Sequence, residues 1–125
     1  MLSGLMAGCA SSGSLGAAAD RLDASAHRFS RQLHDSRAPS HTVTDAAQLA
    51  DAARQFNREV DRSRSRDLLR ASFDDVAERY HHLRQRLDDG GYYARYYDRY
   101  GFDRVTEAYL DVDRAMNHPR SRYEF

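Results

Sequence analysis

The stretch from Leu68 to Leu87 reads LLRASFDDVAERYHHLRQRL, and it decides the fold of this chain. Its apolar residues alternate between spacings of four and three, which is the seam of a helix that packs against other helices. The seam positions are Leu69, Phe73, Val76, Tyr80, Leu83 and Leu87. Asp, Glu, Arg and Gln dominate the positions between them, so we expect the opposite face of this helix to be solvated.

The same seam recurs elsewhere in the chain. It reappears 29 residues on as Phe102, Val105, Tyr109, Val112 and Met116. An earlier pair of seams consists of Ala19, Leu22, Ala26, Phe29 and Leu33 and, 27 residues later, Ala46, Leu49, Ala53, Phe56 and Val60. Because no helix can bury its own stripe, the pattern predicts an all-α, up-and-down four-helix bundle over residues 15–118. The small alanines of the first two seams should let those two helices lie close together.

Local signals divide the first half of the bundle. The first helix is expected over 15–35, and the segment 36–40 ends it because Pro39 disfavours helix at the preceding residue and cannot donate a backbone hydrogen bond. Thr42 or Thr44 is the predicted cap of the second helix, with Asp45 in its first turn, where the helix dipole favours negative charge.

The boundary between the second and third helices is less sharply marked. Val60 and Leu69 are nine residues apart, which loses the heptad phase and predicts a turn at 61–66 with Ser65 as the next cap. The alternative is three helices, with the second and third fused into one bent helix over 45–89. The glycines at 90–91 are expected to end the third helix. The fourth runs from about Phe102 to the Asn-His-Pro at 117–119, and residues 119–125 form a tail.

Composition sets further limits. A chain of 125 residues forms one domain with one core. Nineteen basic and nineteen acidic residues cancel, which argues against nucleic acid as a partner, since phosphate binding calls for a basic surplus. The mean hydropathy is −0.82, and no stretch approaches the ~20 apolar residues of a membrane span. The single cysteine excludes an internal disulfide and a multi-thiolate metal site.

The segment Leu5-Met6-Ala7-Gly8-Cys9, followed by small residues up to Ser14, resembles the lipobox of bacterial lipoproteins. The resemblance implies that residues 1–14 are a truncated signal and a Gly/Ser tether. It also implies that Cys9 is lipidated and becomes the new N-terminus. Small side chains fit the narrow peptidase site, and two or three acyl chains give stable anchoring where one is marginal.

Two departures from the lipobox pattern have consequences. Met6 stands where the family usually has Leu, and only eight residues precede Cys9, without a basic region. A true start codon upstream of Met1 would explain the short leader. Ala10 follows the cysteine where Asp would indicate inner-membrane retention, so we expect the outer membrane, facing the periplasm.

Six histidines raise the question of a metal site. Glu78 and His81 have the Glu-x-x-His spacing of di-iron bundles, but such a site needs the motif twice and inward-facing ligands. The seam through Val76 and Tyr80 turns Glu78 and His81 outward. A metal- or cofactor-binding bundle that uses His27, His34, Glu78, His81 or His82 remains the alternative of a different class. Haem is disfavoured, because no Cys-x-x-Cys-His occurs and Met116 is the only His or Met well placed in the interior.

Catalytic signatures are weak. No serine lies near a positioned histidine and carboxylate, and no glycine-rich phosphate loop follows a strand. The row Asp103, Glu107 and Asp111 repeats at every fourth position, where like charges repel. We therefore expect these carboxylates to face arginines of a neighbouring helix or of a partner.

The segment Tyr92-Tyr93-Ala94-Arg95-Tyr96-Tyr97-Asp98-Arg99-Tyr100 is the most unusual in the chain. Wound as a helix, its five tyrosines fall within roughly 140° of arc, so a short amphipathic Tyr-rich helix is predicted. It serves either as a lid on the bundle or as a contact surface. The contact residues would be Tyr92, Tyr93, Arg95, Tyr96, Tyr97, Arg99 and Tyr100. Tyrosine and arginine are the residue types enriched at binding hot spots.

Together these features predict a non-enzymatic lipoprotein, held at the bacterial envelope through Cys9. It would act as a binding or scaffolding module without a cofactor or metal. The expected partners are the membrane, through the lipid, and an envelope protein, a glycan or a lipid headgroup. If Cys9 is not lipidated, the alternative is a cytosolic helical interaction protein.

Overall fold

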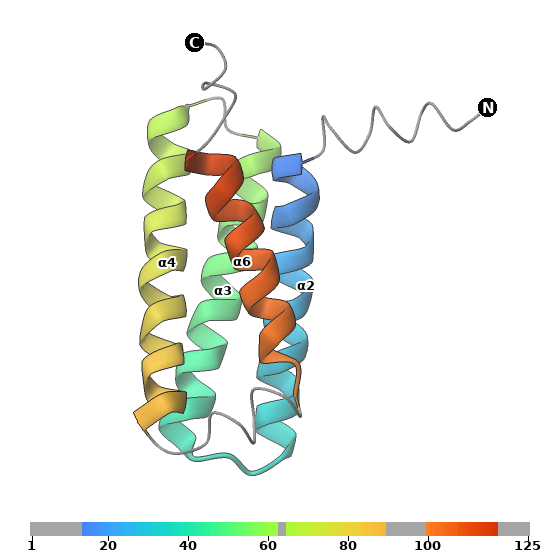
Figure 1. The fold of residues 1–125 in the computed structure, drawn as a ribbon, viewed down its shortest axis with the longest axis vertical. Coiled ribbons are helices and arrows are strands. Elements are labelled where there is room, and N and C mark those ends of the chain that lie inside the picture. The colour runs from blue at the N-terminus through green and yellow to red at the C-terminus, as the bar shows by residue number, and fades with distance from the viewer. Residues whose placement is uncertain (1–13, 63–64, 90–99, 118–125) are drawn as a thin grey trace, which may run out of the picture.

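The chain is built of α-helices in the computed structural model, which describes residues 14–62, 65–89 and 100–117 (Figure 1). The helices are α2 (Ser14–Asp35), α3 (Ser40–Arg62), α4 (Arg66–Asp89) and α6 (Phe102–Asn117). No strand occurs in these ranges, and the predicted all-α helical bundle is confirmed. The predicted signal and tether cover residues 1–14, of which 1–13 lie outside the described residues and Ser14 is instead the first residue of α2. The tail at 119–125 also lies outside the described residues.

The four predicted seams form the hydrophobic core. In α2 every seam residue from Ala19 to Leu33 is at most 1% exposed. The α6 seam is buried from Phe102 to Met116. Val60 and Leu69, at the ends of their helices, are half-buried and pack against the core from its edge. Spacing alone therefore identified the buried face of each helix correctly.

The turn between α2 and α3 corrects one prediction. The amide of Ala38 donates to the carbonyl of Leu33 at 3.4 Å, and Arg37 between them has a φ of 66°, which is the geometry of a Schellman helix end. The carbonyl of Pro39 then accepts from the amides of Thr42 at 2.9 Å and Val43 at 3.0 Å. Helix α3 thus begins directly after Pro39, since proline restricts the residue before it and not the residue after it.

Thr42 is accordingly not the cap of α3, and neither is Thr44, because both lie inside the helix. The side chain of Thr42 is fully buried, and its Oγ1 has no hydrogen-bond partner in the described part of the chain. Asp45 lies beyond the first turn, buried against α4, where Arg86 and His82 approach its carboxylate. The cap prediction, which was based on residue type, failed because the backbone carbonyl of Pro39 accepts the first amide hydrogen bonds of α3.

The break between α3 and α4 falls within the predicted segment 61–66 but is shorter, since residues 61 and 62 belong to α3 and Arg66 begins α4. The hydroxyl of Ser65 accepts from the amide of Leu68 at 3.2 Å, and its carbonyl accepts from the amide of Leu69 at 3.1 Å. Ser65 is therefore the N-cap of α4. Helices α3 and α4 are separate and pack against each other, so the fused-helix alternative is wrong.

The helices pair unequally. Helix α2 packs closely against α3 and α6, and α3 packs closely against α4, whereas the backbones of α4 and α6 rarely come within 8 Å of each other. Figure 1 shows α6 crossing in front of α2 and α3, with α4 to its left. The space between α4 and α6 is filled by aromatic side chains.

These side chains form a central aromatic stack, which consists of Phe102, Tyr80, Tyr109 and Phe73 in that order. The neighbouring ring centroids are 5.6, 4.1 and 5.6 Å apart, and the rings are tilted by only 7, 13 and 19°. Residues of α6 and α4 alternate along the stack. Phe29 of α2 extends one end at 5.1 Å, and Phe56 of α3 extends the other at 5.7 Å.

The stack has an approximate two-fold symmetry that follows from the sequence repeat. Phe73 and Tyr80 occupy the same seam positions as Phe102 and Tyr109, 29 residues apart. The two helices run in opposite directions, so each phenylalanine meets the tyrosine of the other helix and the two tyrosines meet at the centre. The repeat thus produces the order Phe-Tyr-Tyr-Phe.

Candidate functional site

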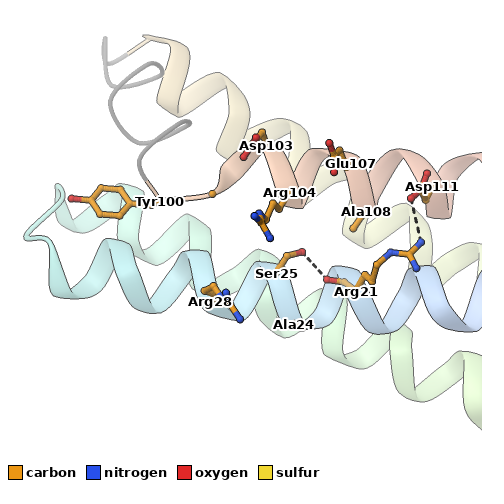
Figure 2. Close-up of a pocket in the computed structure, with 11 residues that line it drawn as sticks. Arg21, Ala24, Ser25, Arg28, Tyr100, Asp103, Arg104, Glu107, Ala108 and Asp111 are labelled. Carbon is orange, nitrogen blue, oxygen red and sulfur yellow. Dashed lines mark hydrogen bonds and ion pairs between the residues drawn. The ribbon is translucent and has the colours of Figure 1, made fainter.

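An open groove with a volume of about 450 Å³ lies between α2 and α6. Its lining residues are Arg21, Ala24, Ser25, Arg28, Tyr100, Gly101, Asp103, Arg104, Glu107, Ala108 and Asp111. Figure 2 shows these side chains spread along the two helices, with Tyr100 at one end and Asp111 toward the other.

Small side chains explain why the groove exists. Ala24 and Ser25 of α2 and Ala108 of α6 line it where the helices meet, and none of them extends far from its backbone. The hydroxyl of Ser25 also donates to the carbonyl of Arg21 at 2.7 Å, which keeps that side chain against its own helix. The larger side chains Arg21 and Arg28 lie about one turn away along α2, so the surface between α2 and α6 is concave at the small residues.

Charges of both signs line the groove. Helix α2 contributes Arg21 and Arg28, and α6 contributes Arg104 as well as the acidic row Asp103, Glu107 and Asp111. Arg21 pairs with Asp111 across the groove at 3.2 Å, and Arg114 approaches the same carboxylate from within α6 at 2.8 Å. The expectation that the acidic row faces arginines of a neighbouring helix is confirmed for Asp111.

The remaining charges of the groove are open to a ligand. Arg28, Arg104, Asp103 and Glu107 are exposed, and none of them has an ion pair with any residue in the described ranges. In Figure 2, Arg104 extends from α6 toward α2, while Asp103 and Glu107 stand on the other side of α6. Charged side chains of both signs therefore surround the open part of the groove.

One end of the groove is formed by Tyr100, the last residue of the predicted Tyr/Arg surface. The other residues of that surface, 92–99, lie outside the described residues. Tyr100 is half-buried and packs against the hydrophobic core, so it is only partly available as a contact residue. Gly101 follows with a φ of 86°. Its carbonyl accepts hydrogen bonds from the amides of Arg104 and Val105, and these bonds begin α6 beside the groove.

The candidate metal ligands are not brought together. His27 contacts Asp23 at 2.9 Å on α2, and His34 lies near Asp35 at the exposed end of the same helix. His82 approaches Asp45 at 3.4 Å. Among the described residues, no group of three or more His, Cys, Asp or Glu side chains could hold a metal ion.

His81 and Glu78 are exposed, as the seam predicted. The structure adds a contact that the sequence did not indicate, because the Nε2 atom of His81 lies 3.3 Å from the hydroxyl of Tyr109. The His81 ring also meets the rings of Tyr80 and Tyr109 edge-on, with centroids at 5.2 and 5.7 Å. Burial and the nearby carboxylate of Asp113 raise the pKa of Tyr109 from 10.0 to about 12.

Two polar contacts between helices were also missed by the sequence analysis. Arg86 donates to the buried carboxylate of Asp45 at 2.7 Å, which joins α4 to α3. The side-chain amide of Asn57 donates to Asp20 at 2.9 Å and to Asp23 at 3.2 Å, which joins α3 to α2. The partners are far apart in the chain, so the only sequence signal for these contacts is that each residue lies beside an apolar seam.

None of the described helices is both long and apolar enough to cross a bilayer. Comparisons with protein-family models, with curated proteins and with solved structures found no match to this chain.

Proposed function

We propose that this chain is a non-enzymatic envelope lipoprotein, tethered through lipid on Cys9, that binds or scaffolds another protein in the periplasm. In this proposal the lipid on Cys9 inserts into the outer membrane, and the four helices follow an up-and-down topology. The pairing of α2 with α3, of α3 with α4 and of α2 with α6 supports that topology. The observation that carries the binding role is the charged groove between α2 and α6.

The charge pattern of the groove favours a protein segment as the partner. A ligand in the groove meets Arg28 from α2 and Arg104 from α6, while Asp103 and Glu107 border the groove on the outer side of α6 (Figure 2). A polypeptide whose acidic side chains reach these arginines and whose basic side chains reach the bordering carboxylates complements charges of both signs. Tyr100, the last residue of the Tyr/Arg segment, lies at the end of the groove, and we propose residues 92–99 as a second contact region for the same partner.

The groove can be tested with a matched pair of double variants. Arg28→Ala with Glu107→Ala removes one charge from each wall, and Arg58→Ala with Asp61→Ala removes the same two charge signs from exposed positions of α3. We expect the groove variant, and not the α3 variant, to lose its cross-linked partners in envelope extracts while both melt like the wild type. Equal retention by the two variants would remove the groove from the proposal.

The Tyr/Arg segment requires its own variant. Changing Tyr93, Tyr96 and Tyr97 together to Ser should leave the melting temperature nearly unchanged and weaken the same cross-links. If this triple variant instead unfolds the bundle, the tyrosines are a lid over the core and the groove alone carries the binding role.

The tether is tested by metabolic labelling. Expressed from its true start in a bacterium, the protein should fractionate with membranes and incorporate labelled palmitate, and Cys9→Ser should abolish both. A wild-type protein that stays unlabelled would make this chain a cytosolic interaction protein, with the groove as its binding surface.

A further inference from the structure

Two large apolar side chains are exposed among the described residues, and they lie in different parts of the bundle. Leu68 is 57% exposed and Leu110 is 45% exposed. Leu68 is the third residue of α4 and so lies at an end of the bundle, whereas Leu110 lies in the middle of α6. A flat surface that meets the bundle end-on therefore reaches Leu68 and not Leu110.

Leu68 lies at the end of the bundle where α2 begins. Asn57, near the end of α3, donates to Asp20, near the start of α2. The break between α3 and α4 follows, and the amide of Leu68 donates to the hydroxyl of Ser65 there. Figure 1 shows the start of α2, the end of α3 and the start of α4 at the same end of the bundle. The start of α2, which the chain reaches from Cys9, thus lies at the end that carries Leu68.

The distance from Cys9 to the bundle is short. Cys9 precedes Ser14, the first residue of α2, by five residues. At no more than about 3.6 Å per residue, this segment spans at most roughly 18 Å in any conformation. Helix α2 has 22 residues and is therefore about 33 Å long. A bilayer that holds a lipid on Cys9 is consequently nearest to the end of the bundle with Leu68.

We propose that Leu68, Arg62 and Arg66 form a membrane-contact surface, which docks on the phospholipid bilayer that anchors Cys9. Leu68 enters the boundary between headgroups and acyl chains, and the two arginines contact the headgroup phosphates. This inference rests on the lipid tether of the proposed function, and it does not depend on the groove.

The charges at this end fit a zwitterionic phospholipid. Arg62 is the last residue of α3 and Arg66 is the first of α4, so they flank the break next to Leu68. Both are exposed, and neither has an ion pair within the described ranges. Asp61 and Asp67 are exposed beside them, so this end has no large basic surplus. A headgroup that offers both a phosphate and an ammonium group complements this mixture.

The tether explains how so small a surface acts. One leucine and two arginines do not hold an untethered protein on a bilayer, since even a single acyl chain binds only marginally. A tether keeps the surface at a high local concentration beside the bilayer, so a weak contact is occupied much of the time. Leu69, the next residue of α4, packs against the core and keeps the first turn of α4 in place.

The chain has no tryptophan and a single cysteine, so both residue types serve as specific labels. The full chain is coupled through Cys9 to a maleimide-headgroup lipid in phosphatidylcholine vesicles that contain brominated acyl chains. We expect Leu68→Trp to show blue-shifted emission and strong quenching by bromine on coupling. Leu110→Trp is the matched control and should show neither, because position 110 lies about 10 Å from the end of α6. Circular dichroism confirms that both variants are folded.

The outcome separates the membrane-contact surface from the anchor itself. Chemical coupling supplies the tether, so the result does not depend on whether a cell attaches lipid to Cys9. Palmitate labelling of the wild type without quenching of Leu68→Trp in vesicles would keep the anchor and overturn the surface. Equal quenching of Leu68→Trp and Leu110→Trp would also overturn it, because the bundle would then meet the bilayer without a preferred face.

The arginines are tested in the coupled Leu68→Trp background. Arg62→Gln with Arg66→Gln should weaken the quenching, because the headgroup phosphates lose their partners. Arg31→Gln with Arg37→Gln removes two exposed charges near the far end of α2 and should leave the quenching unchanged. Equal quenching in the two double variants would overturn the phosphate contacts.

Discussion

The interface between α2 and α3 and the interface between α4 and α6 have the same heptad spacing but side chains of very different size. Ala19, Ala26, Ala46 and Ala53 supply four of the buried seam positions of α2 and α3, and those helices lie close together. The seams of α4 and α6 carry Phe and Tyr at corresponding places, and their rings hold the helices apart. Side-chain size, and not spacing, therefore sets the distance between two helices of this bundle.

The two interfaces also differ in how polar groups meet them. At the α2/α3 interface, Asn57 joins the carboxylates of Asp20 and Asp23 on the neighbouring helix. At the α4/α6 interface, the tyrosines are themselves amphipathic, and their hydroxyls reach Thr106 and His81. Close helices need polar residues beside the seam, whereas wide helices can place polar groups at the ends of their core side chains.

The largest effect is expected from removing a ring at the α4/α6 interface. Phe102 is fully buried between Phe29 and Tyr80, so Phe102→Ala should lower the free energy of unfolding by about 3–5 kcal/mol. Leu110→Ala, at a residue 45% exposed on the same helix, is the control and should cost far less. Chemical denaturation of both variants measures the difference. Equal costs would show that the aromatic stack is not the main support of this interface.

The next effect comes from enlarging a side chain at the close interface. Ala53 is fully buried, so Ala53→Leu should force the neighbouring backbone apart and destabilise the fold by about 1–3 kcal/mol. Ala47→Leu places the same side chain at an exposed position of α3 and should change stability by less than about 0.5 kcal/mol. If Ala53→Leu is tolerated as well as Ala47→Leu, the close approach of α2 and α3 does not depend on alanine.

A smaller effect is expected at alkaline pH. The pKa of Tyr109 is raised from 10.0 to about 12 by burial and by Asp113, so above pH 10 the unfolded chain loses this proton before the folded one. Stability from this group is complete below pH 10 and falls as the pH rises toward 12. The loss should be about 1 kcal/mol, less than the shift alone would give, because solvent reaches the hydroxyl beside His81. Tyr109→Phe should remove this part of the pH dependence, measured by urea denaturation from pH 9 to 12.

The smallest effect concerns the turn that joins the close helices. Arg37 has a φ of 66°, a conformation that glycine adopts without strain, so Arg37→Gly should stabilise the protein by about 0.5–1 kcal/mol. Arg31→Gly introduces the same residue in the exposed interior of α2 and should instead destabilise by about 1 kcal/mol. Melting temperatures of the two variants should therefore move in opposite directions. A fall in both would show that Arg37 makes a contact worth more than the strain.

The sequence by itself determined the helical class, the buried face of each helix and most helix ends. These properties depend on residues close together in the chain, as in the seam from Phe73 to Leu87 and the cap at Ser65. The predicted start of α3 was wrong because the backbone carbonyl of Pro39, and not a threonine side chain, accepts the first hydrogen bonds of the helix. Every residue type has a backbone carbonyl, so residue type does not reveal this contact. The binding surface predicted at 92–99 lies outside the described residues and stays a prediction.

Only the tertiary structure decided which side chains from different helices meet. The groove depends on Arg28 and Glu107 lying on facing helices, and the contact between His81 and Tyr109 depends on the pairing of α4 with α6. Heptad spacing shows that a stripe is buried but not which other stripe covers it, because all four stripes are apolar and each could pack against any other. The partner of a helix is selected by the fit of whole side-chain surfaces, such as rings against rings and alanines against alanines, and that fit exists only in the folded bundle.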